Sequence, residues 1–344
     1  IEPYKIEYES GLLQNIRQEL SLLRKYFFKI FYTILKNKYD IVQIHGATRA
    51  VPQLAALLAA KLTSAKIVYF YHDLLPETAI LLRNIPKESI IYYIVRIFEK
   101  IMCDFSDVII VVSDAMKLIL RKRVKNKKIE VVYPTVNTDE FGNCGSANLR
   151  EKYDIEVAKP VIIYVGKLEP GIRGLELLLE AFSLLIKERN MEAYLFLVGG
   201  GAAEKELRKL AEKLGIERYV IFTGEKGHEE VINHLCIADI AVVPYPESIE
   251  TNVSIPTKLL EYMASGKIIV ASNLAQFRAI LRNDAIYFKP NDVRDLAEKL
   301  EKAVRDIDAL RRTGENLKKK VQKFDEKRVK QKIRKIYLQL NKSK

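Results

Sequence analysis

Short runs of consecutive apolar residues alternate with longer amphipathic stretches along the whole chain. The runs are continuous rather than alternating, which predicts strands that are buried on both faces, as in parallel sheets. In the first part of the chain they cover residues 39–45, 66–72, 107–113 and 128–134. In the second part they cover residues 161–165, 193–198, 219–223, 240–243, 268–271 and 285–288.

The stretches between these runs carry apolar residues at helical spacing, so the pattern predicts strand–helix alternation twice over. A length of 344 residues suits two domains. We therefore expect two Rossmann-like α/β domains, 1–145 and 146–327, followed by a C-terminal helix at 328–344. The small polar residues of Asn143–Asn148 mark the expected linker. The predicted helices are 12–38, 49–62, 87–102, one ending near 124, 173–189, 204–214, 228–237, 256–265, 275–282, 292–310, one from 315, and 325–340.

The net charge of +13 is unevenly distributed. Residues 1–143 hold 21 Lys and Arg against 15 Asp and Glu, residues 144–315 hold 24 against 27, and residues 316–344 hold 12 against 2. The excess on the first third and on the last helix predicts an anionic partner there. Nucleic acid and an anionic membrane both fit this charge, but no nucleic-acid recognition motif is present, so we expect no nucleic-acid partner.

A second set of features concerns location. No run of about 20 uncharged apolar residues predicts a membrane-spanning helix. The three cysteines are scattered without zinc spacing, which favours a reducing, cytoplasmic compartment and no metal. Residues 24–38 mix aromatic residues with cations and have two interpretations: a helix in the headgroup region of a membrane, or a helix packed on a sheet with its lysine stems reaching water.

Two stretches of the second part carry candidate chemistry. A strand ends at Gly166, Lys167 follows, and Arg173 lies at the mouth of the next helix. Lys167 and Arg173 can converge on one anion, and a diphosphate offers oxygens to both. The stretch lacks the Walker and GxGxxG patterns, so a generic NTPase or dehydrogenase is not supported.

The second stretch runs from Pro244 to Ser272, with Pro256 opening a helix and Gly266 closing it. We expect the backbone N–H groups of Asn252, Val253 and Ser254 to face an anion at the start of that helix. Glu261, the only carboxylate of the helix, either binds sugar hydroxyls or is a solvated surface residue.

These stretches resemble the retaining family 4 glycosyltransferases of the GT-B fold. Gly166-Lys167 with Arg173-Gly174 is similar to the family's G-R-x(4–5)-K-G element, with the two cations exchanged in type. The stretch from Pro256 to Gly266 is similar to its P-x-K-x-x-E-Y-M-A-x-G helix. Leu197–Gly201 and Phe222–Glu225 match its V-G-x-G and F-x-G turns, and Asp40–His45, Phe70–Asp73 and Glu99 with Asp107–Ser113 resemble its acceptor-side strands.

The resemblance implies hexosyl transfer with retention from a UDP- or GDP-linked sugar to a lipid-linked or polysaccharide acceptor, in a cleft between the domains. Lys167 and Arg173 would neutralise the diphosphate and so make a metal or other cofactor unnecessary, and His72 would line the acceptor side, although a structural role for His72 remains open. It also implies that the last helix crosses back to the first domain. The nucleotide-sugar site would comprise Gly166, Gly200, Gly224, Glu225, Asn252, Val253, Ser254, Lys258 and Glu261.

Two departures from the family pattern keep alternatives open. Many relatives carry a second Glu eight residues before the ribose-binding one, where this chain has Val253. The family's first strands and Gly-rich loop are not recognisable in residues 1–38, so we expect a truncated or trimmed first domain. A non-catalytic GT-B protein that binds a nucleotide sugar or partners a complete transferase is therefore an alternative, as is a GT-B epimerase; a phosphorylase would need a lysine or phosphate site that we do not find.

Overall fold

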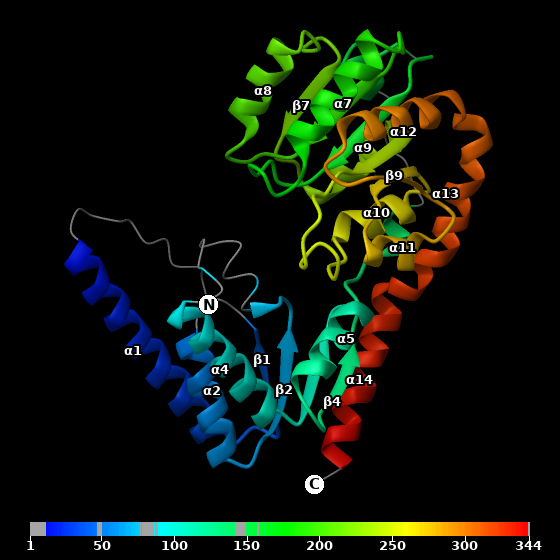
Figure 1. Cartoon of the computed structure of the whole chain (residues 1–344). Helices are drawn as coiled ribbons and strands as arrows, with labels where there is room; N and C mark the ends of the chain where they lie inside the picture. The colour runs from blue at the N-terminus through cyan, green and yellow to red at the C-terminus, as the bar shows by residue number, and fades with distance from the viewer. Residues whose placement is uncertain are drawn as a thin grey trace. The chain divides into compact units, whose positions relative to one another are not determined.

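The computed structural model describes residues 12–46, 50–75, 77, 86, 89–141, 149–156 and 158–342, without the side chains of 12–20, 22, 23 and 342. The chain divides into two compact units. The first comprises Ile1–Val132 with Ile333–Lys344, and the second comprises Tyr133–Lys332. Figure 1 labels helices and strands of both units.

The first unit is built on a parallel sheet with the strand order β1-β2-β3-β4. The strands are Ile41–His45, Lys66–Tyr71, Val108–Val111 and Lys128–Val131. The central strands β2 and β3 are almost completely buried, as their continuous apolar sequence predicts. The helices of this unit are α1 (Leu12–Asn37), α2 (Ala50–Leu62), α4 (Ile90–Phe105), α5 (Asp114–Arg123) and the end of α14 (Glu326–Lys342).

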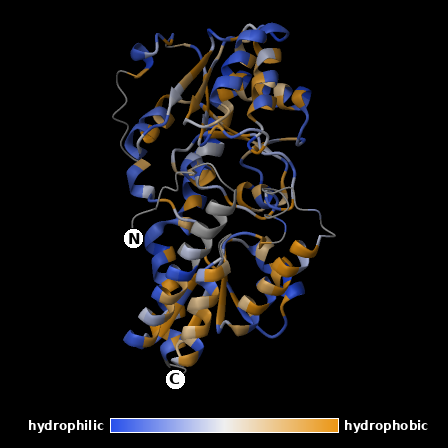
Figure 2. Ribbon diagram, turned by 90° about the vertical axis from the view of Figure 1, so that its left-hand side faces the viewer, coloured by the Kyte–Doolittle hydropathy of each residue, from blue (hydrophilic) through white to orange (hydrophobic). Residues whose placement is uncertain are grey.

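Local sequence explains where the helices of the first unit begin. The side chain of Ser89 accepts a hydrogen bond from the backbone N–H of Tyr92 at the start of α4, and Ser113 caps α5 through Met116 in the same way. The five buried residues of α2 that are apolar are four alanines and Leu57, and small side chains of this kind allow close packing against α1 and the sheet. In Figure 2 the strands take mostly the hydrophobic colours, whereas the helices carry both colours.

The second unit is built on a six-stranded parallel sheet with the order β10-β9-β8-β5-β6-β7. Strand β5 (Val161–Val165) lies between β8 (Ile240–Val243) and β6 (Tyr194–Val198), so the chain order reverses at this point. In open parallel sheets the crevice beyond the carboxyl ends of the strands at such a reversal is the usual ligand site. The other strands are β7 (Val220–Gly224), β9 (Ile268–Ser272) and β10 (Ile286–Phe288).

Two hydrophobic cores cover the faces of this sheet. Val161 and Ile163 of β5 belong to one core, and Ile162 and Tyr164 belong to the other, as expected from the alternation of side chains along a strand. The helices of this unit are α6 (Leu149–Lys152), α7 (Leu175–Lys187), α8 (Glu204–Lys213), α9 (His228–Ile237), α10 (Thr257–Ala264), α11 (Ala275–Leu281), α12 (Val293–Arg305) and α13 (Ile307–Val321), with 3₁₀ turns η1 (Thr138–Phe141) and η2 (Gln322–Phe324).

Two boundaries differ from the expected ones. The units divide between residues 132 and 133 rather than after 145, because Val136 and Phe141 pack in a core of the second unit. The hydroxyl of Thr138 also donates to Asp325 at 2.8 Å. The last part of α14, from Ile333, is grouped with the first unit, close to the expected start at 328. The expected linker at 143–148 lies outside the described residues.

The helices after residue 292 also differ from the prediction of one helix to 310 and another from 315. The break falls at Asp306, and α13 continues through the Gly314 position. A Cβ at Gly314 would lie 2.0 Å from the carbonyl oxygen of Gly266, so this glycine allows α13 to approach the turn after α10. Glycine is needed there for close packing and does not end the helix.

Candidate functional site

The turn between β5 and α7 presents Arg173 at the carboxyl end of β5. Gly174 follows with φ +67°, and a Cβ on it would lie 1.8 Å from the carbonyl oxygen of Pro244, the residue that follows β8. Only glycine combines this backbone conformation with this approach. The contact therefore holds Arg173 beside the end of β8.

The guanidinium of Arg173 is oriented by Tyr245. Its Nη1 donates to the Tyr245 hydroxyl at 3.0 Å, and its central carbon lies 5.3 Å from the centre of the Tyr245 ring. Nη2 also pairs with Glu169 at 3.5 Å. Burial raises the pKa of Tyr245, and the nearby Arg173 opposes that rise, so the phenol stays a neutral hydrogen-bonding partner.

Lys258 is a second cation at the same place, and it is only 8% exposed. Its Nζ lies 3.7 Å from the centre of the Tyr164 ring and 5.5 Å from that of Tyr245. A Cβ on Gly166, at φ +133°, would lie 2.5 Å from this Nζ, so Gly166 leaves the room that the ammonium occupies. Burial, followed by the charge of Arg173, lowers the pKa of Lys258 well below its usual value, and Glu261 acts against that shift.

Glu261 lies three residues after Lys258 on α10, on nearly the same side of the helix. Burial raises the pKa of its carboxyl group, whereas His228 and Lys258 lower it. Within the part of the chain that the structure describes, no group donates a hydrogen bond to this carboxylate. It is therefore an acceptor in a half-buried position next to a cation, rather than the solvated surface residue of the alternative interpretation.

Through its backbone carbonyl, which accepts a hydrogen bond from the Tyr164 hydroxyl at 3.3 Å, Lys167 contacts this cluster. It is exposed, and no ion pair involves its ammonium among the described side chains. The cation whose charge acts on Lys258 is Arg173, so the structure combines Arg173 with Lys258. The convergence of Lys167 and Arg173 on one anion stays a prediction.

The loop before α10 differs from the expected geometry. The backbone N–H of Asn252 donates to Ser248, and those of Val253 and Ser254 donate to Glu250. Helix α10 begins at Thr257, so these three N–H groups lie before the helix and close a turn of the loop instead. The expectation that they face an anion is not met in this conformation, because all three N–H groups already donate to carbonyl groups of their own loop.

The remaining predicted residues meet at the ends of β6 and β7. The N–H of Gly199 donates to the Gly224 carbonyl at 3.1 Å, and a Cβ on Gly200 would lie 3.5 Å from the backbone nitrogen of Glu225. The guanidinium of Arg208 covers the Phe222 ring at 4.4 Å. The structure thus brings Gly200, Gly224 and Glu225 together.

In the first unit, His72 follows β2 and pairs with His45, which ends β1. Nδ1 of His45 lies 2.7 Å from Nε2 of His72, and the ring centres are 5.0 Å apart. Burial and the neighbouring His72 both lower the pKa of His45.

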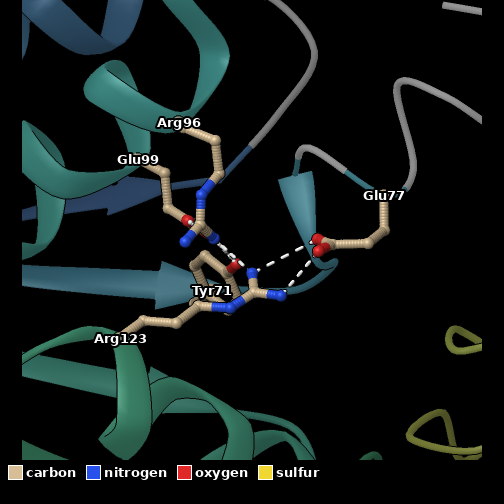
Figure 3. A network of polar contacts seen from close by, with 5 residues as sticks. All are labelled: Tyr71, Glu77, Arg96, Glu99 and Arg123. Carbon is tan, nitrogen blue, oxygen red and sulfur yellow. Dashed lines mark hydrogen bonds and ion pairs between the residues drawn. The ribbon is translucent and has the colours of Figure 1, made fainter. Parts of the chain in front are cut away.

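A buried ionic network lies at the end of β2, where Tyr71 is the last residue of the strand (Figure 3). Glu99 is 3% exposed and accepts hydrogen bonds from Arg96, Arg123 and the Tyr71 hydroxyl. Both terminal nitrogens of Arg123 also donate hydrogen bonds to the Glu77 carboxylate, at 2.6 and 3.2 Å. Burial acts to lower the pKa of Arg123, but Glu77 and Glu99 raise it overall.

Sequence reasoning missed the aromatic residues of the second unit's site. The Tyr164 ring contacts Lys258, and the Tyr245 hydroxyl accepts a hydrogen bond from Arg173. The Tyr262 hydroxyl accepts a 2.8 Å hydrogen bond from the Val165 N–H and so holds the end of β5. The signal for Tyr164 and Tyr245 was tyrosine within or just after a buried strand, whereas Tyr262 belongs to the motif of helix α10. His234 of α9 is buried and bonded to Tyr153 and to the Glu230 carbonyl, which is a structural role.

The described residues bear on two further expectations, those about a metal site and a membrane-spanning helix. They contain no group of three His, Cys, Asp or Glu side chains arranged to hold a metal ion. None of their helices combines the length and apolar character needed to cross a membrane.

Two Rossmann-like α/β units, each built on a parallel sheet, are the architecture of the GT-B fold, and solved structures of this fold match the chain. A glycosyltransferase from Rickettsia africae matches 99% of this chain and 85% of its own with a TM-score of 0.75 at 21% identity. Anabaena HepE in complex with UDP matches 91% of this chain and 82% of its own with a TM-score of 0.75 at 18% identity.

Family models then specify the class further. The model described as glycosyl transferases group 1 matches residues 146–320, and that of glycosyltransferase family 4 matches residues 9–140. An uncharacterized glycosyltransferase of Methanocaldococcus jannaschii is 24% identical over 297 residues, which is 85% of this chain and 73% of that protein. The chain belongs to the group 1, family 4 glycosyltransferases.

Proposed function

We propose that this glycosyltransferase moves a hexosyl unit, with retention and without a metal, from a UDP- or GDP-linked sugar to a lipid-linked or polysaccharide acceptor. The observation that carries the donor class is that Arg173 and Lys258 lie against the same Tyr245 ring, with the guanidinium carbon 5.3 Å and Nζ 5.5 Å from its centre. The charge of Arg173 disfavours a protonated Lys258, so an anion with several oxygens bound beside them would stabilise both cations.

The reaction that fits these residues is departure of a nucleoside diphosphate. Negative charge develops on the leaving diphosphate as its bond to the sugar breaks, and cations already held in place stabilise that charge most. Arg173 is held by Tyr245 and Lys258 by Tyr164, so neither has to reorganise during the reaction. Glu261 would accept hydrogen bonds from the ribose hydroxyls, and Lys167 would approach the diphosphate from solvent.

A calorimetric titration with UDP and GDP tests the donor site. We expect one nucleotide to bind, with its affinity lowered about 10- to 100-fold in Glu261→Gln and in Lys258→Met, since a hydrogen bond to a charged group contributes about 1.5–3 kcal/mol. Glu206→Gln on α8, an exposed position, is the matched control and should bind like wild type. UDP is the first nucleotide to try, because HepE was solved with it.

The same titration separates the alternatives. Folded wild-type protein that binds neither nucleotide would contradict the donor site. Tight binding without hydrolysis or transfer of any UDP- or GDP-sugar would favour the non-catalytic alternative.

For the acceptor side we propose contact with an anionic membrane surface through α1 and the basic C-terminal helix, at the inner face of the cell membrane. Exposed aromatic residues and cations share one side of α1: Phe28 is 60% exposed and Tyr32 is 66% exposed, and Lys25 and Lys29 are exposed beside them. Residues 24–38 contain no acidic residue. Cations with aromatic rings at helical spacing suit an anionic headgroup region.

Sedimentation with vesicles of equal parts phosphatidylglycerol and phosphatidylcholine tests this surface. We expect Lys25→Glu/Lys29→Glu to lose binding, whereas the matched reversal Lys205→Glu/Lys209→Glu on exposed positions of α8 should keep it. Equal binding by both variants would contradict the assignment of the surface to α1.

A further inference from the structure

Four polar side chains of the first unit form a continuous hydrogen-bonded chain that ends at His72. Tyr337 of α14 (red in Figure 1) donates to Gln43 of β1, and the Gln43 amide contacts His45 two residues further along the strand. Nδ1 of His45 then lies 2.7 Å from Nε2 of His72. The chain joins residues that are 294 positions apart in the sequence, so no local motif contains it.

The chain has a direction, which follows from the groups that can donate at each step. The Tyr337 hydroxyl donates to Oε1 of Gln43, which leaves the amide nitrogen of Gln43 facing Nε2 of His45. An amide nitrogen can only donate, so Nε2 of His45 must accept and carry no proton. A neutral imidazole that is unprotonated at Nε2 is protonated at Nδ1.

The order of donors and acceptors continues from His45 to His72. The Nδ1–H of His45 donates to Nε2 of His72, so that nitrogen also carries no proton. The proton of a neutral His72 is therefore on its Nδ1. Among the side chains that the structure describes, none bonds to this Nδ1.

Ring packing keeps the two imidazoles in register. The His45 ring stacks on Phe70 with the centres 5.0 Å apart and the planes at 9°, and His72 stacks on the same Phe70 at 5.4 Å. Phe70 is 9% exposed, so the surface on which both histidines rest is fixed by the core. Burial and the proximity of His72 lower the pKa of His45, which favours the neutral ring that the chain requires.

We propose that Tyr337, Gln43 and His45 are positioning residues that set the tautomer of His72, so that His72 presents an Nδ1–H donor to an oxygen of a bound saccharide. This inference rests on the proposed function for the part that His72 plays in binding. It assigns His72 the role of a hydrogen-bond donor and not of a base. It also makes the C-terminal helix, through Tyr337, a contributor to the site of the first unit.

The test is long-range ¹H–¹⁵N NMR of the imidazoles in the full chain at pH 8.5, with the His72 signals identified by their loss in His72→Gln. We expect wild-type His72 to be protonated on Nδ1. Gln43→Glu should reverse the chain, because a carboxylate accepts from both Tyr337 and His45. The His45 proton would then move to Nε2, and His72 would become an Nε2–H donor to Nδ1 of His45.

Matched variants separate this effect from loss of structure. Gln339→Leu removes a glutamine of α14 that bonds to Lys128 and not to the chain, and it should leave His72 protonated on Nδ1. An Nε2–H tautomer in wild type would overturn the proposal, as would an Nδ1–H tautomer that persists in Gln43→Glu.

The tautomer measurement needs no substrate, so its failure is distinct from a failure of the proposed function, which the nucleotide titration reports. Where transfer is measurable, we expect Gln43→Glu to lower kcat about tenfold, the equivalent of one hydrogen bond, without changing KM for the nucleotide sugar. An unchanged kcat with a reversed tautomer would overturn the donor role of His72.

Discussion

The two units hold the side chains at the carboxyl ends of their strands in different ways. In the second unit, backbone approach and burial fix them: Gly174 lies against Pro244, and Lys258 is enclosed by tyrosine rings. In the first unit, an exposed hydrogen-bonded chain and the ionic network around Glu99 do so. The cation site of the second unit therefore depends on steric fit, whereas the histidine site of the first depends on polar contacts between distant segments.

The steric fit at Gly174 in the second unit predicts the largest effect on stability. Gly174→Ala should lower the free energy of unfolding by about 4 kcal/mol, because it adds backbone strain to a clash with the Pro244 carbonyl. Gly171→Ala is a matched control: its φ is +66°, but nothing lies within 4 Å of an added Cβ, so the cost should be about 1 kcal/mol. Urea unfolding measures both, and equal losses would show that strain and not contact matters.

The ionic network predicts the next largest effect. Arg123→Met removes a partner of the buried Glu99 and should cost about 3 kcal/mol in unfolding free energy. Arg121→Met, at an exposed position of the same helix, should stay within about 0.5 kcal/mol of wild type. Addition of Glu99→Gln to Arg123→Met should recover part of the loss; no recovery would argue that packing, and not the buried charge, explains it.

Removal of one tyrosine hydroxyl in each unit allows a direct comparison of their effects on stability. Tyr262→Phe leaves the Val165 N–H without its acceptor in a fully buried place and should cost about 2 kcal/mol. Tyr337→Phe breaks an exposed contact and should cost less than about 0.5 kcal/mol. Thermal unfolding of the two variants checks this order, and a larger loss for Tyr337→Phe would reverse our interpretation.

The smallest expected effects concern how the free energy of unfolding changes with pH, and the first comes from a single residue, Lys258. The folded pKa of Lys258 lies below the unfolded value, so the unfolded chain binds more protons between the two, and stability should rise with pH through that window up to about 10.5. The slope from this one proton is at most about 1.4 kcal/mol per pH unit. Lys258→Met should remove it, as unfolding curves at a series of pH values would show.

His45 should act with the same sign but in the acid range, because its folded pKa also lies below its usual 6.5. Its contribution should be smaller than that of Lys258, since its contacts are exposed. A His45→Gln variant whose stability followed the wild-type pH profile below 6.5 would contradict this.

Much of the fold could be predicted from the sequence. Continuous apolar runs located the strands of both sheets, because burial on two faces leaves a local signature. The stretch from Pro256 to Gly266 marked α10 and with it Lys258 and Glu261. The prediction that Asn252, Val253 and Ser254 face an anion failed, because their N–H groups donate to Ser248 and Glu250 in a turn of the loop that the sequence pattern did not reveal.

Local sequence patterns are enough to indicate the class of the protein, the parallel sheets and the residue types at the strand ends. The folded chain was needed to see that Arg173 meets Lys258 between Tyr164 and Tyr245, and that Tyr337 reaches His72 through Gln43 and His45. The physical reason is the distance along the sequence over which each signal acts. Periodicity and turn chemistry indicate only how a residue contacts its near neighbours in the sequence. Desolvation, charge pairing and hydrogen-bond direction depend on segments that only the packing of the folded chain brings together.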